Sequence, residues 1–205
     1  MSKHDLKEIS PEDRWAQTVE ASMFDRSEGL DSPSASECRE LLRKRYRVDT
    51  GLIRHSEKVA QLAVTIGKAL NKKGLELDLR LIEAASLLHD MFRGERDHGL
   101  LAGRLLRQLE YPKVAYIVEN HMQPFYQDRD KLTEHVIVCL SDKFVQEDCL
   151  VPLEVRFEKK LVYYANNPRI KTMVHSRFMD AKTAQTHVEI ILGHPIEKFF
   201  AQLSK

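Results

Sequence analysis

Apolar residues recur at helical spacing along most of the chain. From residue 51 to residue 192 they return every three or four positions, which is the period of an α-helix with one buried face. Glycine and proline fall between these stretches, where helices end. No stretch alternates apolar and polar residues over a length that predicts a sheet. The pattern predicts an all-α fold with helices at residues 51–71, 78–90, 97–109, 113–122, 133–146, 152–166 and 170–192, and a short one after Pro195.

The N-terminal part of the chain follows a different pattern. Residues 11–24 have amphipathic helical spacing, and the stretch after them, which contains Gly, Pro and Ser, predicts a loop. Ser34 or Ser36 is expected to cap the next helix, because a serine side chain accepts a hydrogen bond from the first backbone N–H groups. The sequence therefore predicts an N-terminal helix and linker segment at 1–36 and one helical domain at 37–205.

The segment from Leu79 to Asp90 is apolar on almost every side. A helix of this kind must be covered by other elements of the fold. Because it ends in the adjacent pair His89 and Asp90, it carries an imidazole and a carboxylate into the interior. Neighbouring helical residues point about 100° apart, so these two side chains can approach one cation from adjacent directions.

Four more polar residues lie on apolar helix faces. His55, His98 and His121 each continue a stripe of valine, leucine or isoleucine, and Asp142 closes the apolar run VIVCL. Their side chains are therefore expected to point towards the core. The remaining histidines lie in tails, on mixed faces or near helix ends, and are expected to be solvated: His4, His135, His175, His187 and His194.

The number of inward polar groups is what favours a metal. One histidine on an apolar face is ordinarily a hydrogen-bonded core residue, and Asp142 alone is accounted for by a salt bridge with Lys143 or an arginine. Burying several imidazoles and carboxylates without a common partner costs several kcal/mol for each charge. A shared cation removes that cost, so the inward residues taken together predict a metal centre.

Composition and charge narrow the classes of function. The 32 Lys and Arg residues against 31 Asp and Glu leave a formal net charge of +1, which gives no electrostatic reason to expect nucleic acid or a membrane as partner. The basic runs at 43–47 and 158–160 are accordingly interpreted as solvated helix faces. Three cysteines without CxxC spacing favour neither a disulfide framework nor a zinc knuckle. No stretch reaches the roughly 18 apolar residues that span a bilayer, so the sequence predicts a cytoplasmic protein.

The ordered set of inward residues resembles the metal-binding pattern of the HD-domain phosphohydrolases. That pattern is a histidine, an adjacent His-Asp pair and a distal aspartate. It is matched by His55 in RHSEKVA, by His89 and Asp90 in LLHDMFRG, and by Asp142 in LSDKFVQ. The resemblance covers most of the chain and implies an HD-domain helical bundle whose metal-site core lies at about 50–146.

Two further histidines refine the resemblance. His98 in HGLLAGRLL and His121 in VENHM look like the extra histidines of HD subfamilies that hold two metals, such as cyclic-di-nucleotide phosphodiesterases and dinucleoside tetraphosphate hydrolases. The chain has HDMFRG in place of HDIGK and lacks GYP, which disfavours a cyclic dinucleotide as substrate. The stretches RHSEKVA, HDMFRG and DKFVQEDCLVPLEVRF together resemble the HD module fused to, or encoded beside, molybdopterin nucleotidyltransferase-like proteins.

The resemblance implies one or two divalent ions. Asp90 belongs to the ligands of the first ion and bridges to a second ion held by His98 and His121. The other ligands of the first ion are His55, His89 and Asp142. Mixed nitrogen and oxygen ligands suit iron or manganese, with zinc and magnesium as alternatives.

Nearby cations are candidates for binding the phosphates of a substrate. Arg93 follows the His-Asp pair and Lys143 follows the distal aspartate, and with Asp90 they are the expected catalytic residues. Arg54 and Arg96 are further candidates, since the planar guanidinium matches phosphate oxygens. For each of these cations the alternative is a solvated surface charge.

Three functions compete at this stage. The first is a metal-dependent phosphohydrolase that cleaves a phosphate ester or anhydride of a nucleotide or another phosphorylated small molecule. The second is a metal- and nucleotide-binding regulatory or partner module for a nucleotidyltransferase, without hydrolytic turnover. The third is a purely structural helical domain whose inward histidines bond to carbonyl groups. The sequence leaves the oligomeric state open.

Overall fold

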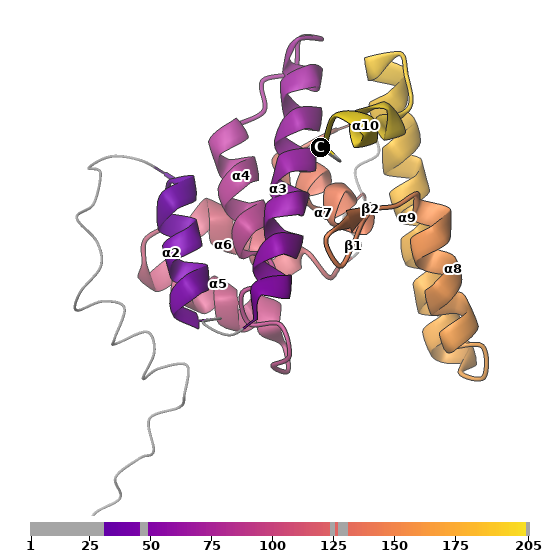
Figure 1. Cartoon of the computed structure of the whole chain (residues 1–205), viewed down its shortest axis with the longest axis horizontal. Helices are drawn as coiled ribbons and strands as arrows, with labels where there is room; N and C mark the ends of the chain where they lie inside the picture. The colour runs from indigo at the N-terminus through magenta and orange to yellow at the C-terminus, as the bar shows by residue number, and fades with distance from the viewer. Residues whose placement is uncertain (1–30, 46–48, 124–125, 127–130, 204–205) are drawn as a thin grey trace, which may run out of the picture.

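The fold is a bundle of α-helices with one short β-hairpin (Figure 1). The computed structural model describes residues 31–45, 49–123, 126 and 131–203, so the amphipathic segment expected at 11–24 lies outside the described residues. The all-α prediction is confirmed. The elements are α2 (Ala35–Arg45), α3 (Thr50–Asn71), α4 (Leu79–Leu88), α5 (His98–Gln108), α6 (Pro112–Asn120), α7 (Glu134–Lys143), β1 (Val145–Gln146), β2 (Cys149–Leu150), α8 (Leu153–Tyr163), α9 (Pro168–Leu192), the 3₁₀ turn η1 (Ile196–Phe199) and α10 (Phe200–Leu203).

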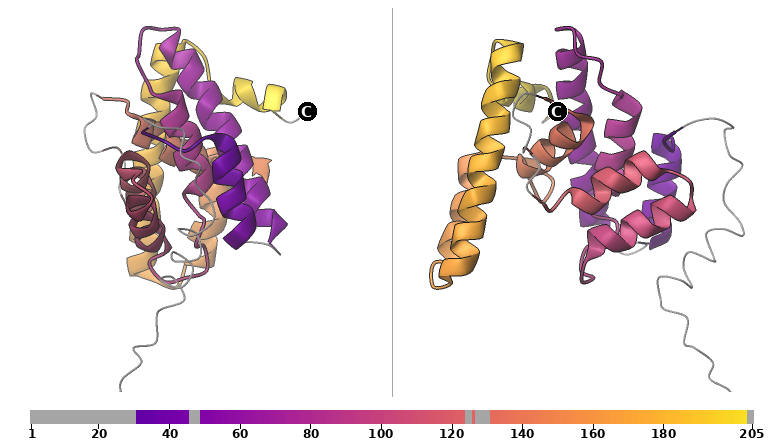
Figure 2. Two further views of the ribbon diagram at one scale, coloured as in Figure 1. Left: turned by 90° about the vertical axis from the view of Figure 1, so that its left-hand side faces the viewer. Right: turned by 180° about the vertical axis from the view of Figure 1, so that it is seen from behind.

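The helices form a body and an arm. Helices α3 and α4 run side by side in opposite directions, with α2, α6 and α7 packed around α4 and the α5–α6 pair across the lower end of the body in Figure 1. Helices α8 and α9 pair with each other and stand to one side of the body as an arm, as Figure 1 and the right-hand view of Figure 2 show. Helix α9 also contacts α3 and α7, which joins the arm to the body.

Side-chain caps start the helices close to the predicted positions. The Ser34 hydroxyl accepts a hydrogen bond from the Glu37 N–H at 3.3 Å, and the Glu37 carboxylate accepts one from the Ser34 N–H at 2.6 Å. This reciprocal capping box confirms Ser34, rather than Ser36, as the cap of α2. Each such cap stabilises a helix by about 1 kcal/mol. Single side-chain caps start α3, α4, α7 and α9 at Asp49, Asp78, Thr133 and Asn167.

The hairpin corrects one sequence prediction. The helix expected at 133–146 ends at Lys143, and β1 pairs antiparallel with β2 in the register Val145 to Leu150 and Gln146 to Cys149. Strands of two residues are too short to show the alternation by which a strand is recognised. The turn between them contains Glu147 in the left-handed conformation, with φ of 57°.

Helix α4 is the most deeply buried element, as its composition predicts. Ile82, Ala85, Leu87 and Leu88 have no exposed surface, and α2, α3, α6 and α7 cover them. Full burial of a large apolar side chain stabilises a fold by about 1.5–3 kcal/mol. The helix ends at Leu88, two residues earlier than predicted. The His-Asp pair therefore lies in the turn that follows α4.

Helices α5 and α6 approach closely because α5 carries glycine where they meet. A Cβ atom on Gly99 would lie 3.0 Å from the backbone oxygen of Val118 and 3.3 Å from that of Glu119. These are backbone atoms, so a larger side chain would force the two helices apart. The close approach brings the start of α5, with His98, against the end of α6, with His121.

Among the described residues, none of the helices has the length and apolar character needed to cross a lipid bilayer.

We expect the replacement Gly99→Leu to destabilise the fold by about 1–3 kcal/mol, the usual cost of overpacking. The neighbouring replacement Leu100→Ala is the control, since this side chain is 50% exposed and its removal should change stability by less than about 0.5 kcal/mol. Urea unfolding of both variants measures the two free energies. Equal stability of Gly99→Leu and the wild type would show that the helices do not meet at this glycine.

Candidate metal centre

Four histidines and two aspartates from five helices converge in the interior, as the sequence analysis predicts. His55 lies in the second turn of α3, and His89 and Asp90 follow α4. The other three come from the start of α5, the end of α6 and the last turn of α7: His98, His121 and Asp142. All are buried except His98, whose side chain is 19% exposed.

The first cluster surrounds one point with two imidazoles and two carboxylates. The Nε2 atom of His55 lies 3.7 Å from Asp90 Oδ2 and 3.3 Å from Asp142 Oδ1. The Nε2 atom of His89 lies 3.5 Å and 3.7 Å from the same two oxygens. The donor atoms of His55, His89 and Asp90 all lie within 4.8 Å of one another. This is a ligand set of nitrogen and oxygen that suits a divalent transition metal.

The second cluster shares Asp90 with the first. Its other oxygen, Oδ1, lies 3.3 Å from His98 Nε2 and 3.5 Å from His121 Nε2, and these two nitrogens are 3.2 Å apart. The two oxygens of one carboxylate therefore face two different clusters. That arrangement fits a carboxylate that bridges two ions.

Backbone carbonyls determine which ring nitrogen of His89 and of His121 is available to bind a metal. The Nδ1 atoms of His89 and His121 lie 2.8 Å and 2.6 Å from the carbonyl oxygens of Ser86 and Val118, three residues earlier in each chain segment. A carbonyl only accepts, so each Nδ1 carries a proton and each Nε2 keeps its lone pair in the neutral ring. The carbonyl groups at the ends of α4 and α6 therefore orient both rings.

The hairpin gives His55 the same support. Its Nδ1 atom donates to the carbonyl oxygen of Glu147, the left-handed turn residue, at 2.7 Å. The Nε2 atoms of His55 and His89 are buried and make no hydrogen bond within the described part of the chain. A buried polar atom left without a partner costs about 1–3 kcal/mol. A cation at the centre of the cluster satisfies both lone pairs, so the residues present fit a metal ion.

The two aspartates remain ionised despite their burial. Burial alone would raise the pKa of Asp142, but the ammonium of Lys143 and the guanidinium of Arg156 outweigh it and hold that pKa well below its usual value. Burial likewise opposes ionisation of Asp90, and the imidazoles of His89, His121 and His98 lower its pKa. The interior therefore contains two negatively charged carboxylates next to imidazole nitrogens that carry lone pairs.

The pKa values of the His89 and His121 imidazoles are shifted in opposite directions. Burial lowers the pKa of His121, which keeps the ring neutral and able to bind a metal. Burial also acts against a charge on His89, but the negative charges of Asp90 and Asp142 outweigh it and raise the pKa of this ring. A proton on His89 and a metal cation therefore compete for the same pair of carboxylates.

Arg156 is a functional contact that the sequence analysis did not identify. Its Nη1 donates to the backbone oxygen of Asp142 at 2.6 Å, and its Nη2 lies 3.3 Å from Oδ1 of the same residue. An arginine was foreseen as a partner of Asp142, but nothing in the pattern of 152–166 marks this one. Lys143, with Nζ 2.6 Å from Asp142 Oδ2, completes the pairing and is itself buried.

The other residues predicted to bind phosphate differ in whether they contact the metal centre. Arg93 lies at the edge of the centre, with Nη1 3.2 Å from Asp90 Oδ2 and a side chain 57% exposed. Arg54 forms an ion pair with Asp148 in the turn of the hairpin. Arg96 is 97% exposed and lies beside Asp97. The structure thus brings Arg93, like Lys143, to the metal centre and gives Arg54 and Arg96 no contact with its ligands.

The histidines expected to be solvated are only partly so. His175 is exposed, and His4 lies outside the described residues. His135, His187 and His194 are half-buried instead, against the rings of Tyr116, Tyr126 and Phe199. Aromatic partners distant in sequence cover two of these rings, so position on a helix alone does not predict their burial.

A hollow of about 340 Å³ adjoins the second cluster, on the side of His98. Such a hollow provides space for a substrate beside the ligands. It is lined by Asp97, His98, Gly99, Leu100, Glu119, Asn120, Met122 and Gln123.

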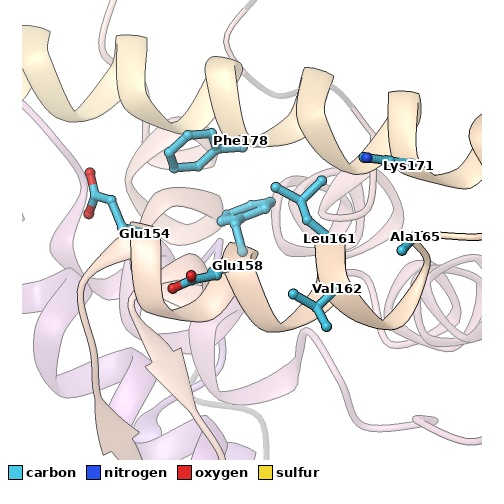
Figure 3. A pocket seen from close by; sticks show the side chains of 8 residues that line it. Glu154, Glu158, Leu161, Val162, Ala165, Lys171 and Phe178 are labelled. Atoms are coloured by element: carbon cyan, nitrogen blue, oxygen red, sulfur yellow. The ribbon is translucent and has the colours of Figure 1, made fainter.

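Two larger hollows lie away from the clusters. One of about 500 Å³ lies between α8 and α9, where Figure 3 shows Phe178 of α9 facing Leu161 of α8. The other, of about 420 Å³, lies where α6 meets the start of α7. No metal-cluster residue lines either of them.

The helical fold and the two clusters of potential metal ligands are those of an HD-type helical domain, and comparison with known proteins agrees. The model of the HD domain family matches residues 52–146, which include all of the cluster residues. The chain belongs to this family, whose members are generally metal-dependent hydrolases.

The uncharacterised protein MJ0778 of Methanocaldococcus jannaschii is 32% identical over 143 residues, an alignment that covers 60% of this chain and 83% of that protein. No solved structure matches the chain significantly. Neither match involves a molybdopterin nucleotidyltransferase, so that resemblance stays a prediction.

We expect the replacement Asp90→Ala to remove metal from both clusters, because the two oxygens of this carboxylate face different ones. His121→Ala should remove only the ion of the second cluster, and His175→Ala, at an exposed position, should change nothing. Metal analysis of untagged protein, by inductively coupled plasma mass spectrometry, gives the stoichiometries. Equal metal content in the wild type and in Asp90→Ala would contradict the bridging role.

Metal removal should also lower thermal stability. An ion present at 100 times its dissociation constant stabilises the folded state by about 2.7 kcal/mol, which corresponds to about 5–10 °C in Tm for a chain of this size. Differential scanning calorimetry before and after chelation measures the shift. The variant His55→Ala should show a smaller shift, and an identical shift in both proteins would mean that the ion is bound elsewhere.

Proposed function

We propose that the protein is a metal-dependent phosphohydrolase that cleaves a phosphate ester or anhydride of a nucleotide or another phosphorylated small molecule. The observation that carries this proposal is the pair of clusters that share Asp90, with free imidazole lone pairs on both sides of it. Ligand sets shared in this way are typical of two-metal sites that act on phosphates. Membership of the HD domain family supports the same class of reaction.

The residues of the chain have distinct roles in this proposal. His55, His89, Asp90 and Asp142 hold one divalent ion, and Asp90, His98 and His121 hold a second. Such ions lower the pKa of water and neutralise charge on phosphoryl oxygens. The abundance of imidazole favours iron or manganese over magnesium, and zinc is an alternative.

The cations at the edge of the centre would position the substrate. Arg93 is exposed on one side and contacts Asp90 on the other, so its guanidinium can bind a phosphate beside the ions. Lys143 and Arg156 pair with Asp142 and orient its carboxylate. In the reaction, the oxygen of water forms a bond to phosphorus and the bond to the leaving oxygen breaks. The leaving oxygen keeps the electron pair of that bond, and the protons of water pass to the products or to solvent.

The test is a screen of nucleotides, dinucleoside polyphosphates and cyclic nucleotides against protein loaded separately with iron, manganese, zinc and magnesium. We expect turnover in the wild type, a loss of about 100-fold or more in Asp90→Asn, and an increase in KM of about tenfold in Arg93→Gln, since a charge-assisted hydrogen bond contributes about 1.5–3 kcal/mol. Arg104→Gln, at an exposed position on α5, is the control.

Two outcomes would contradict the proposal. Turnover that persists in Asp90→Asn would place the reaction outside the clusters. Metal and nucleotide binding without turnover for any compound or metal would favour the alternative, a regulatory or partner module for a nucleotidyltransferase.

A further inference from the structure

The arm carries a basic surface that extends away from the metal centre. Arg156 contacts Asp142, and Lys160 follows it by four residues on α8, which places the two side chains on the same face of the helix one turn apart. Between them, the ring of Phe157 packs against Phe178 of α9, with 5.2 Å between ring centroids. Arg177, the neighbour of Phe178 on α9, is close enough for its positive charge to act on Lys160.

Charge on this surface is poorly balanced. Lys143 and Arg156 share the single carboxylate of Asp142. Lys160 and Arg177 form no ion pair with any residue that the structure describes. Four cations therefore lie near one carboxylate, and that carboxylate is already a metal ligand in the proposed site.

The environment of Lys160 shows how close these charges are. Burial among its neighbours lowers its pKa to about 8, and the positive charges of Arg156, Lys143 and Arg177 act in the same direction, while Asp142 opposes them. Its ammonium lies 6.0 Å from the centroid of the Phe157 ring. This basic run was interpreted from the sequence as a solvated helix face, and Lys160 is exposed on α8 as that interpretation expects.

The opposite side of the arm has a different chemistry. Glu154 and Glu158 lie along the apolar hollow between α8 and α9 (Figure 3), and the residues that line this hollow do not include Arg156 or Lys160. Glu154 is paired with Lys182 there. Acidic and basic side chains are therefore mixed on that side of α8, with Lys171 also lining the hollow, whereas Arg156 and Lys160 lie on the side that contacts the metal centre.

We propose that Arg156, Lys160 and Arg177 bind a second phosphate group of the substrate while the first lies at the metal clusters, so that the substrate is a phosphoanhydride with at least two phosphates. The choice of an anhydride rests on the proposed function, whereas binding of a polyphosphate to this basic surface does not. Hydrolysis would form one P–O bond from water and break the bridging P–O bond. The electron pair of the broken bond stays on the phosphate held by the arm, and the protons of water pass to the two product phosphates or to solvent.

The first test measures binding without turnover. Full-length protein stripped of metal by a chelator is titrated with inorganic tripolyphosphate in a calorimeter. We expect Lys160→Gln to weaken binding about tenfold, Lys160→Arg to keep it within twofold, and Lys159→Gln, the exposed neighbour on another face of α8, to leave it unchanged. Equal affinity of Lys160→Gln and the wild type would overturn the proposal, and so would an equal loss in Lys159→Gln.

The pH dependence of the same titration provides a second test. Lys160 loses its proton as the pH rises through about 8, so tripolyphosphate should bind the wild type more weakly at pH 9 than at pH 7. The charged groups around it are Arg156, Lys143, Arg177 and Asp142. Lys160→Arg stays charged and should have a flatter profile. The same slope in Lys160→Arg and the wild type would contradict the assignment to Lys160.

The kinetic test separates this inference from the function on which it partly rests. With metal-loaded protein, Lys160→Gln should raise KM for a nucleoside triphosphate about tenfold and leave KM for p-nitrophenyl phosphate unchanged, because the latter has one phosphate. An equal change for both substrates would contradict a second phosphate site. If no compound is hydrolysed but the binding differences persist, the hydrolase assignment fails and the polyphosphate site stands.

Discussion

The structure depends on how two carboxylates and four imidazoles share an interior from which water is largely excluded. Lys143 and Arg156 balance the charge of Asp142, and carbonyl groups accept hydrogen bonds from the protonated nitrogen of three imidazoles. The centre itself is lined by imidazole lone pairs and carboxylate oxygens. Such groups repel one another unless positive charge lies between them, and each unpaired buried charge would cost several kcal/mol. A bound cation is the simplest arrangement that makes this interior stable.

The fold builds the centre from the ends of helices. His89 and His121 follow the last residues of α4 and α6, and Asp142 lies in the last turn of α7. The carboxyl end of a helix carries a partial negative charge of about half an electron charge, so three helices direct that charge to the same place. In two of them the histidine also uses a carbonyl of its own last turn, which would otherwise lack a partner. The same local hydrogen bond, from Nδ1 to the carbonyl three residues earlier, thus orients both histidines.

Much of the fold and of the centre follows from the sequence, for identifiable reasons. Helices and their starts are predictable because spacing and caps are local, as at Ser34 and Asp78. The metal ligands are predictable because a polar residue on an apolar face is conspicuous. Arg156 and the hairpin carbonyl that holds His55 were missed because both act through contacts between segments far apart in the chain. The effect of Arg177 on Lys160 was missed for the same reason, since Arg177 lies on another helix.

The most direct test of this account is anomalous X-ray diffraction from crystals of untagged protein, at the absorption edges of iron, manganese and zinc. The account predicts a peak bonded to Nε2 of His55 and His89 and to oxygens of Asp90 and Asp142, at about 2.0–2.2 Å, and a second peak near His98 and His121 when two ions bind. A map without a peak among the first four residues, in protein shown to contain metal, would contradict it.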